Sequence, residues 1–415
     1  MNRFITCALL LLFLTACKPG AEDVDNLRTG VWRAVIEIQD RELPFNFEVI
    51  RDNGGGYDLY LINADERLLL DEVALNGDSV NIALHIFDAN IKAKISGDSL
   101  QGLFIKNYAQ NYRLPFKAVY GQDFRFEKGD TSENPVDFRG KYAVTFLHEG
   151  DTTEAIALIN QDGDRVTGTF MTATGDYRFL EGSAEGRHLK LSTFDGNHLY
   201  LFEASLSVDG NIEGEFFSGK TWRETWIAER NENASLPDAE KLTFLKAGHD
   251  KLTFTFPDAD GKLVSLEDKK YKDKVVILQL LGTWCPNCMD ETKFLSPWYD
   301  ENKERGVEVI ALAYERKDDF AYASGRVKKM ADKLDVRYDI LIAGTDDKEK
   351  AAKTLPMLNA VIAFPTTLFI GKDGRVKKIH TGFNGPGTGH YFDQFKEDFN
   401  QTVNTLLKED FTAVR

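Results

Sequence analysis

Residues 275–291 read Val-Val-Ile-Leu-Gln-Leu-Leu-Gly-Thr-Trp-Cys-Pro-Asn-Cys-Met-Asp-Glu, and this stretch decides the fold of the C-terminal part of the chain. It opens with an apolar run broken only by Gln279, which predicts a strand buried on both faces. Cys285 and Cys288 follow at the junction with a predicted helix, where such a pair indicates redox chemistry. The helix dipole and its free N–H groups stabilise a thiolate on the first sulfur. We therefore expect Cys285 to be the attacking thiolate and Cys288 to be the shielded partner.

Two other readings of this cysteine pair are weaker. A structural zinc ion needs two further ligands, and this part of the chain offers only His380 and His390, without a second cysteine pair. A purely structural disulfide would account neither for the preceding Trp284 nor for the position at a strand-to-helix junction.

Strands and helices alternate around this stretch, which predicts an α/β fold with helices on both faces of a sheet over residues 251–410. Further strands are expected at 307–314, 338–342, 366–370 and 375–380. Helices are expected at 291–305, 318–334, 348–358 and 391–408.

The stretch 275–291 resembles the active-site segment of the TlpA/ResA-like thioredoxin family of exported, membrane-tethered thiol-disulfide oxidoreductases. Residues 364–374, Phe-Pro-Thr-Thr-Leu-Phe-Ile-Gly-Lys-Asp-Gly, resemble the cis-proline strand of that family. The resemblance covers about 251–408 and implies a thioredoxin-like fold. It also implies a substrate groove lined by Trp284, Pro286, Phe364, Pro365 and Thr366.

The same resemblance implies that Glu291 handles the proton of the buried thiol, although a carboxylate in the first turn also simply suits the helix dipole. One departure concerns Gln279, six residues before Cys285, where thioredoxins often carry a buried Asp. Because glutamine cannot take up a proton, Glu291 or water would have to do so.

The N-terminal half is predicted to be all-β and duplicated. Alternating apolar and polar runs separated by pairs such as Asn76-Gly77 and Asp162-Gly163 indicate antiparallel hairpins. Gly30-Val-Trp32 recurs as Gly140-Lys-Tyr142, an offset of 140 − 30 = 110 residues, and residues 97–104 match 209–216. We expect two copies, at 30–126 and 136–230, of about five to seven strands each, forming two sandwiches or two halves of one barrel.

No catalytic constellation is visible in these copies. Their aromatic residues are expected in the core: Trp32, Tyr142, Trp222 and Trp226. Their histidines lack ligand spacing and are expected at the surface or satisfied within the sheets: His85, His148, His188 and His198.

The N-terminus reads as an export signal. Arg3 is followed by an apolar run from Phe4 to Ala16 that is too short to span a bilayer. Leu14-Thr-Ala-Cys17 resembles the bacterial lipoprotein box, which implies a signal peptide at 1–16 and a lipidated Cys17. The alternatives are an ordinary signal peptide and a buried helix. Residues 17–29 would form a tether, which implies a lipoprotein of the bacterial cell envelope, anchored in the membrane and facing the periplasm.

Composition narrows the class of protein further. The 415 residues suggest about three domains, and 231–250 is polar enough to be a linker between the copies and the C-terminal domain. Lys plus Arg number 51 and Asp plus Glu 66, giving a net charge of −15 that argues against nucleic acid as a partner. With 42% hydrophobic and 28% charged residues, the chain is of the folded class. Only four cysteines are present, which excludes a disulfide framework.

The combined prediction is a reductase of protein disulfides without a metal or other cofactor. Because the sequence shows no flavin or nicotinamide site, another thiol protein would have to re-reduce it. A peroxiredoxin-like peroxidase would need a threonine and a proline where Gly282 and Leu278 stand. A third possibility is a β module that binds an unknown ligand or partner and carries a regulatory redox domain.

Overall fold

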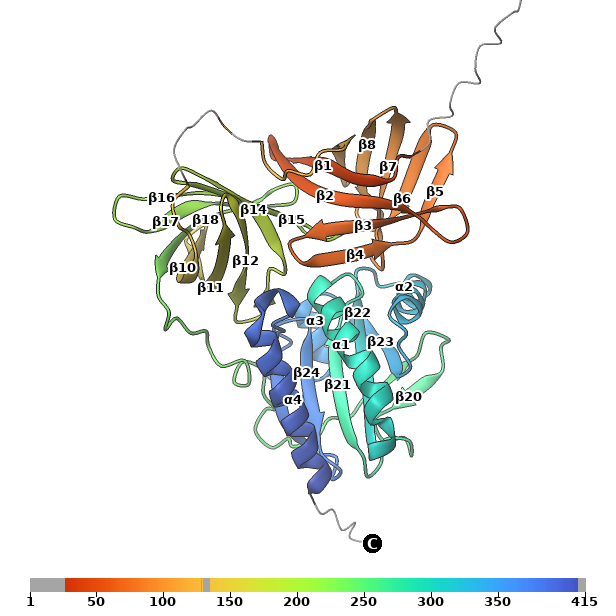
Figure 1. Ribbon diagram of the computed structural model, residues 1–415. Helices are drawn as coiled ribbons and strands as arrows, with labels where there is room; N and C mark the ends of the chain where they lie inside the picture. Colours follow the sequence, from red (N-terminus) through yellow and green to blue (C-terminus); the bar gives the residue numbers. More distant parts are fainter. Residues whose placement is uncertain (1–26, 128, 130–134, 410–415) are drawn as a thin grey trace, which may run out of the picture.

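The computed structural model describes residues 27–127, 129 and 135–409. They form two antiparallel β units that lie side by side over one end of an α/β domain (Figure 1). The second unit is a closed barrel, and the first is a barrel-like sheet whose two end strands do not pair with each other. The expected signal peptide at 1–16, Cys17 and nearly all of the tether lie outside the described residues. Among the described residues, no helix is both long and apolar enough to cross a membrane.

The first repeat folds into one antiparallel sheet in the order β4-β3-β2-β1-β9-β8-β7-β6-β5. Its strands are β1 (Gly30–Ile38), β2 (Arg41–Arg51), β3 (Tyr57–Asn63), β4 (Glu66–Leu70), β5 (Val73–Asn76), β6 (Ser79–Ala83), β7 (Ala89–Ser96), β8 (Ser99–Lys106) and β9 (Arg113–Tyr120). We call this unit the first barrel.

The second repeat closes on itself, because β11 pairs with both β10 and β12. Its strands are β10 (Gly140–His148), β11 (Asp151–Asp162), β12 (Arg165–Thr172), β13 (Gly175–Asp176), β14 (Leu180–Glu185), β15 (His188–Phe194), β16 (Leu199–Leu206), β17 (Ile212–Ser218) and β18 (Trp222–Arg230). We call it the second barrel.

The described residues of each repeat thus form nine strands, and the expectation of five to seven was too low. Two of the nine strands are too short to show alternation: β5 has four residues and is exposed along most of its length, and β13 has two residues. Each repeat makes a complete sheet of its own, so the alternative of two half-barrels is wrong.

A glycine at equivalent places in the two repeats has a steric reason. Gly102 on β8 and Gly214 on β17 each lie where an added Cβ would overlap the backbone of the neighbouring strand, at Lys92 and Glu203 respectively. Only glycine lets the strands approach so closely there.

Aromatic side chains fill the second barrel. Phe146, Phe170, Phe202, Phe216 and Trp226 are at most 3% exposed, and the rings of Phe202 and Phe216 stack at 4.4 Å. The interior is therefore a packed core.

Two of the sequence predictions for individual β residues were wrong. Trp222 is 47% exposed, because it begins β18 at the barrel rim, where it stacks on His148 instead of entering the core. His85 is buried, and neither of its ring nitrogens has a hydrogen-bond partner. Burial lowers the pKa of His85 to about 4, so it is neutral.

The C-terminal domain is a five-stranded sheet in the order β23-β22-β21-β24-β25, with β21, β22 and β23 parallel. Its strands are β21 (Val275–Leu281), β22 (Val307–Glu315), β23 (Asp339–Thr345), β24 (Thr366–Ile370) and β25 (Val376–Thr381), and a small hairpin, β19 (Thr255–Pro257) and β20 (Leu263–Ser265), precedes them. Its helices are α1 (Pro286–Asn302), α2 (Phe320–Lys333), α3 (Lys348–Thr354) and α4 (His390–Lys408).

The helices differ from prediction at two ends. α1 begins at Pro286, directly after Cys285, so the cysteine pair opens the helix as expected and the predicted range 291–305 began five residues too late. α3 ends at Thr354 because Pro356 disfavours helical backbone at the residue before it.

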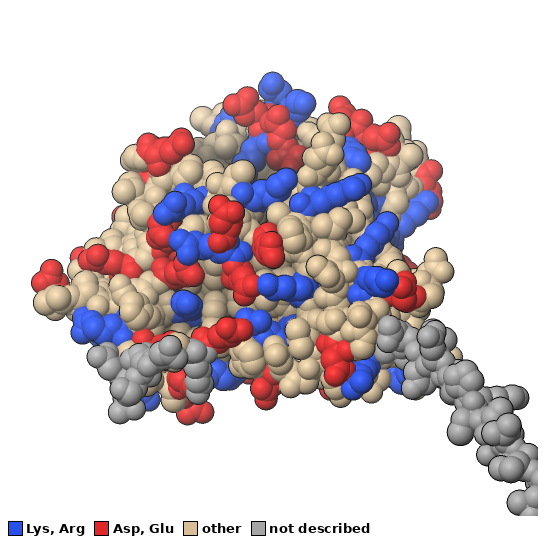
Figure 2. Space-filling view, turned by 90° about the horizontal axis from the view of Figure 1, so that it is seen from above, with Lys and Arg blue, Asp and Glu red and all other residues tan. Residues whose placement is uncertain are grey.

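Lys, Arg, Asp and Glu side chains of both signs are mingled over the face that the molecule presents from above (Figure 2). That face carries no single-sign field of the kind that a nucleic acid requires.

Candidate active site

Cys285 occupies the N-cap of α1. Its sulfur accepts a hydrogen bond from the backbone N–H of Cys288 at 3.3 Å, and its thiol donates to the carbonyl oxygen of Phe364 at 3.4 Å. Pro286 takes the first helical position, where a missing N–H costs nothing. The Cys285 sulfur therefore lies at the positive end of the helix dipole.

Cys288 lies one turn inside the helix and is fully buried. Burial, together with its contact to Cys285, raises the pKa of the Cys288 thiol well above its usual value. The two thiols are not bridged. The pair therefore combines a capped outer sulfur with an inner thiol that keeps its proton.

Glu291 is also fully buried, on the turn of α1 that follows Cys288. It accepts hydrogen bonds from the Thr367 hydroxyl and from the Gln279 amide, both at 2.6 Å. Burial raises the pKa of Glu291 to about 7, so a proton can leave or enter near neutrality. Gln279 cannot take up a proton itself, but its amide donates the hydrogen bond that positions Glu291, which can.

The structure brings the expected groove residues together beside Cys285. The peptide bond between Phe364 and Pro365 is cis. The Trp284 ring meets that of Phe364 edge to face at 6.0 Å, and the Arg316 guanidinium lies 4.0 Å from the centre of the Trp284 ring. Thr366 is 1% exposed, and its hydroxyl donates inward to the carbonyl of Ala363.

Residues of the second barrel also touch the cysteine turn, and sequence reasoning missed them. The Asn197 amide donates to the carbonyl oxygen of Trp284 at 2.9 Å. The Asn287 amide donates to the carbonyl of Asp176 at 3.0 Å, and Arg178 binds Asp290. In the sequence these residues stand in short polar segments between strands, which look like ordinary turns, so no signal distinguishes them.

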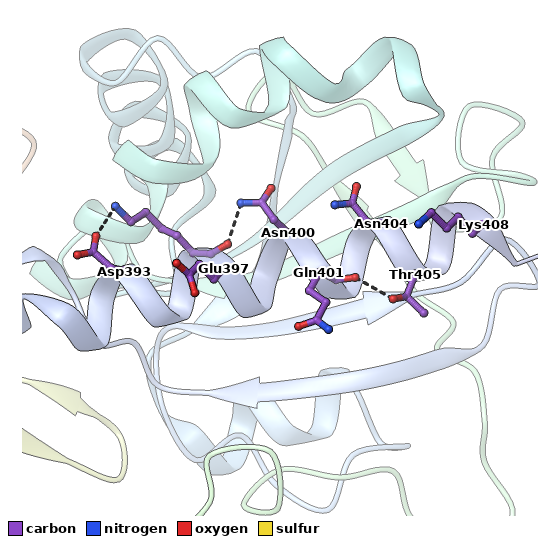
Figure 3. A pocket seen from close by; sticks show the side chains of 8 residues that line it. Asp393, Glu397, Asn400, Gln401, Asn404, Thr405 and Lys408 are labelled. Carbon is purple, nitrogen blue, oxygen red and sulfur yellow. Dashed lines mark hydrogen bonds and ion pairs between the residues drawn. The ribbon is translucent and has the colours of Figure 1, made fainter.

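A shallow surface groove lies away from this site. It runs along the polar side of α4, from Asp393 to Lys408, and α4 alone lines it (Figure 3). None of the redox residues faces it. Within it, Asp393 pairs with Lys396 at 2.8 Å.

Curated relatives match the α/β domain. Over 132 residues, the chain is 33% identical to the thiol-disulfide oxidoreductase ResA of Bacillus thuringiensis subsp. konkukian, which covers 32% of this chain and 68% of that protein. The chain belongs to the ResA family of thiol-disulfide oxidoreductases. ResA of Halalkalibacterium halodurans is 30% identical over 139 residues, covering 33% of this chain and 69% of the relative.

Two further comparisons fall on the same ResA-type domain. The AhpC/TSA family model matches residues 247–379. A solved thiol:disulfide interchange protein of the thioredoxin family from Chlorobium tepidum is 20% identical with a TM-score of 0.30, covering 38% of this chain and 95% of the other. The protein is thus a thioredoxin-like thiol-disulfide oxidoreductase with two barrels N-terminal to its redox domain.

Proposed function

We propose that the protein reduces disulfides of client proteins through a mixed-disulfide intermediate. The observation that carries this proposal is the asymmetry of the pair: Cys285 caps a helix, whereas Cys288 is fully buried with a raised pKa. Such an asymmetry suits one sulfur to attack the client and the other to resolve the mixed disulfide.

In the first step, the Cys285 thiolate attacks one sulfur of the client disulfide. A bond forms between Cys285 and that sulfur, and the other client sulfur leaves as a thiolate that takes up a proton. Cys288 then gives its proton to Glu291 and attacks the Cys285 sulfur. This forms the Cys285–Cys288 disulfide and releases the second client thiolate, which takes up a proton. Two electrons pass to the client, and another thiol protein returns them afterwards.

Trp284, Pro286, Phe364, Pro365 and Thr366 are proposed to form the client groove. The first four surround Cys285, and the backbone at Phe364 already bonds its thiol. We place the inward-facing Thr366 in the wall of the groove and not on its surface.

We also propose that Cys17 is lipidated after removal of residues 1–16, so that 17–29 tethers the protein to the bacterial envelope, facing the periplasm. In this division, 30–126 and 136–230 are the barrels, 231–250 is the linker and 251–410 is the redox domain. Metabolic labelling with a fatty-acid analogue, compared between wild type and Cys17→Ala, tests the anchor. Equal labelling of the two would contradict it.

Replacing each cysteine in turn tests the mechanism. Cys285→Ser should abolish reduction of insulin disulfides, and Cys288→Ser should accumulate a mixed disulfide with the client, because the resolving thiol is missing. Non-reducing electrophoresis and mass spectrometry would show this. Equal trapping by both variants would contradict the assigned roles. If the wild type consumed hydrogen peroxide faster than it reduced insulin disulfides, a peroxidase would be favoured instead.

The direction of electron flow has its own test. Because reductases and oxidases share the motif and differ in potential, the Cys285–Cys288 couple should have a reduction potential of about −270 mV or below, as in thioredoxin. A value near about −120 mV, as in a strong oxidant, would contradict a reductase.

A further inference from the structure

Two segments of the second barrel lie over the cysteine turn. One is the hairpin at 172–178 around β13, and the other is the loop at 195–198 between β15 and β16; together we call them the cover. The cover contacts the redox domain next to each cysteine, through Asn197 at Trp284 and through Asp176 at Asn287. Packing is close enough that a Cβ on Gly382 would lie 2.6 Å from the backbone of Thr174.

Arg178 fixes the cover to both neighbouring units. It is 1% exposed, and its guanidinium binds three carboxylates: Asp290 of α1 at 2.7 and 3.0 Å, Asp195 of the cover at 2.9 Å, and Glu66 of the first barrel. These carboxylates raise the pKa of Arg178 further although burial opposes its charge. We call Arg178 and its three partners the latch.

The consequence for the redox site is occlusion. Cys285 is 6% exposed and Phe364 is 9% exposed, and the cover binds Trp284 and Asn287 on either side of Cys285. A polypeptide client that approaches Cys285 therefore meets the cover. A mixed disulfide needs the client sulfur in line with Cys285, which requires that this surface be open.

The direct contacts between the cover and the redox domain are mostly polar. The contacts named above are ionic, amide-to-carbonyl or through glycine, and the aromatic core of the second barrel is a cluster separate from that of the redox domain. A small apolar cluster of Ile156, Met171 and Ala234 meets Tyr391 of α4 directly. Phe194, Leu199, Leu201 and Phe217 join the apolar cluster that the first barrel shares with the redox domain, and Phe194 packs there on Phe45 and Phe104 of the first barrel. Polar interfaces of this kind permit relative motion of domains.

We propose that the second barrel is a gate over the dithiol, closed by the latch, and that a client reaches Cys285 only after the gate opens. This inference rests on the proposed function for its meaning, because it adds the regulation of the same site. It makes Arg178 a positioning residue that never touches the client.

Two variants open the gate by different means. Arg178→Met removes the cation of the latch and, among the interactions of the described residues, leaves Asp195 only its contacts within the cover, to Asn197 and His198, and Asp290 only its ion pair with Lys293. Gly387→Ala keeps all charges but places a Cβ 2.7 Å from the backbone of Arg178, so that the cover has to shift. Should Arg178→Met fail to fold, Gly387→Ala still provides the test.

Each variant has a matched control. Arg187→Met removes an exposed arginine of the same barrel, whose guanidinium bonds only to backbone carbonyls of Leu206 and Ser207 among the hydrogen bonds of the described residues. Gly325→Ala adds the same methyl group on α2, where no atom lies within 4 Å of the new Cβ.

The measurement is the alkylation rate of Cys285 in the reduced full-length protein, followed by mass spectrometry, with N-ethylmaleimide and with the same maleimide on a polyethylene-glycol chain. Wild type and controls should strongly disfavour the large reagent. Arg178→Met and Gly387→Ala weaken contacts that exist only in the closed state. In both variants, the ratio of the alkylation rate with the large maleimide to that with the small one should rise by about tenfold or more.

An unchanged ratio of the two rates in both gate variants would overturn the gate, even if the protein reduces protein disulfides normally. A changed ratio in either variant supports the gate, even if the protein proves unable to reduce them, because alkylation needs only an accessible thiol. The two proposals can therefore fail separately.

Discussion

Replacing Glu291 by glutamine should remove a pH dependence from the stability of the redox domain. The carboxyl group is fully buried, and its pKa rises from 4.5 to about 7 on folding. The folded state therefore holds this proton between those two values while the unfolded chain releases it. Stability from Glu291 is complete below pH 4.5, falls as the pH rises, and is lost above about pH 7.

The size of the effect follows from the shift. Each pKa unit corresponds to about 1.4 kcal/mol, so the whole shift is worth about 3 kcal/mol, of which about 2.5 kcal/mol is lost between pH 5 and pH 8. Glu291→Gln has no proton to lose, and the Thr367 hydroxyl can rotate to meet the new amide. The difference in free energy of opening between wild type and variant should change by that amount across this range.

Hydrogen exchange of peptides from β21 (Val275–Leu281) is the suitable assay. These amides report the opening of the redox domain itself, whether or not the barrels unfold with it. Comparing both proteins at the same pH cancels the intrinsic exchange rate and the titration of other buried carboxyls such as Asp176. A wild-type-minus-variant difference that stays constant from pH 5 to pH 8 would refute a Glu291 proton held near neutrality.

The barrels allow two further predictions. Phe202→Ala should destabilise the second barrel by about 3–5 kcal/mol, because it leaves a cavity in the aromatic core. The control Phe124→Ala removes a side chain that is 38% exposed and should cost less than about 1 kcal/mol. Similar losses of stability for the two variants in thermal unfolding would contradict a packed interior. Gly214→Ala should cost about 1–3 kcal/mol by forcing β16 and β17 apart, and β17 amides that remain as protected as in wild type would show that the glycine is dispensable.

Local chemistry decided how much the sequence could predict. The apolar run Val275–Leu281 forms a strand over its whole length, as expected, because a strand covered on both faces buries all seven of its side chains. The cysteine pair was correctly expected to open a helix, but the predicted helical range began at Glu291, because sequence rules do not count a cysteine side chain among helix caps. The short strands β5 and β13 are held by their neighbours and carry no pattern of their own.

The same limit applies to the site. Cys285, Cys288 and Glu291 are close in sequence, so their spacing on one helix was enough to bring them together. Arg178 and Asp290 are 112 residues apart, and their ion pair exists only because two separate units dock. Pairing of this kind depends on tertiary placement, which a single sequence does not encode locally.

Duplication gave the two barrels the same outward loops. The turns after β3 and β12, and those after β6 and β15, stand at corresponding places in the two repeats. In the second barrel, Asn197 lies in the turn after β15 and Asp176 on β13 just beyond the turn after β12, and both meet the cysteine turn. In the first barrel, Asp88 lies in the turn after β6 and accepts a hydrogen bond from Tyr322 of α2, and Glu66 begins β4 just beyond the turn after β3 and reaches Arg178.

The order of the domains along the chain bears on how the protein folds during its synthesis. Both barrels precede the redox domain in the chain, and domains generally fold in the order of their synthesis. The receiving surface is thus assembled before Cys285 and Cys288 are made. We therefore expect the newly made dithiol to dock on that surface while its own domain folds, with its thiols exposed to oxidants for a shorter time than in an isolated redox domain.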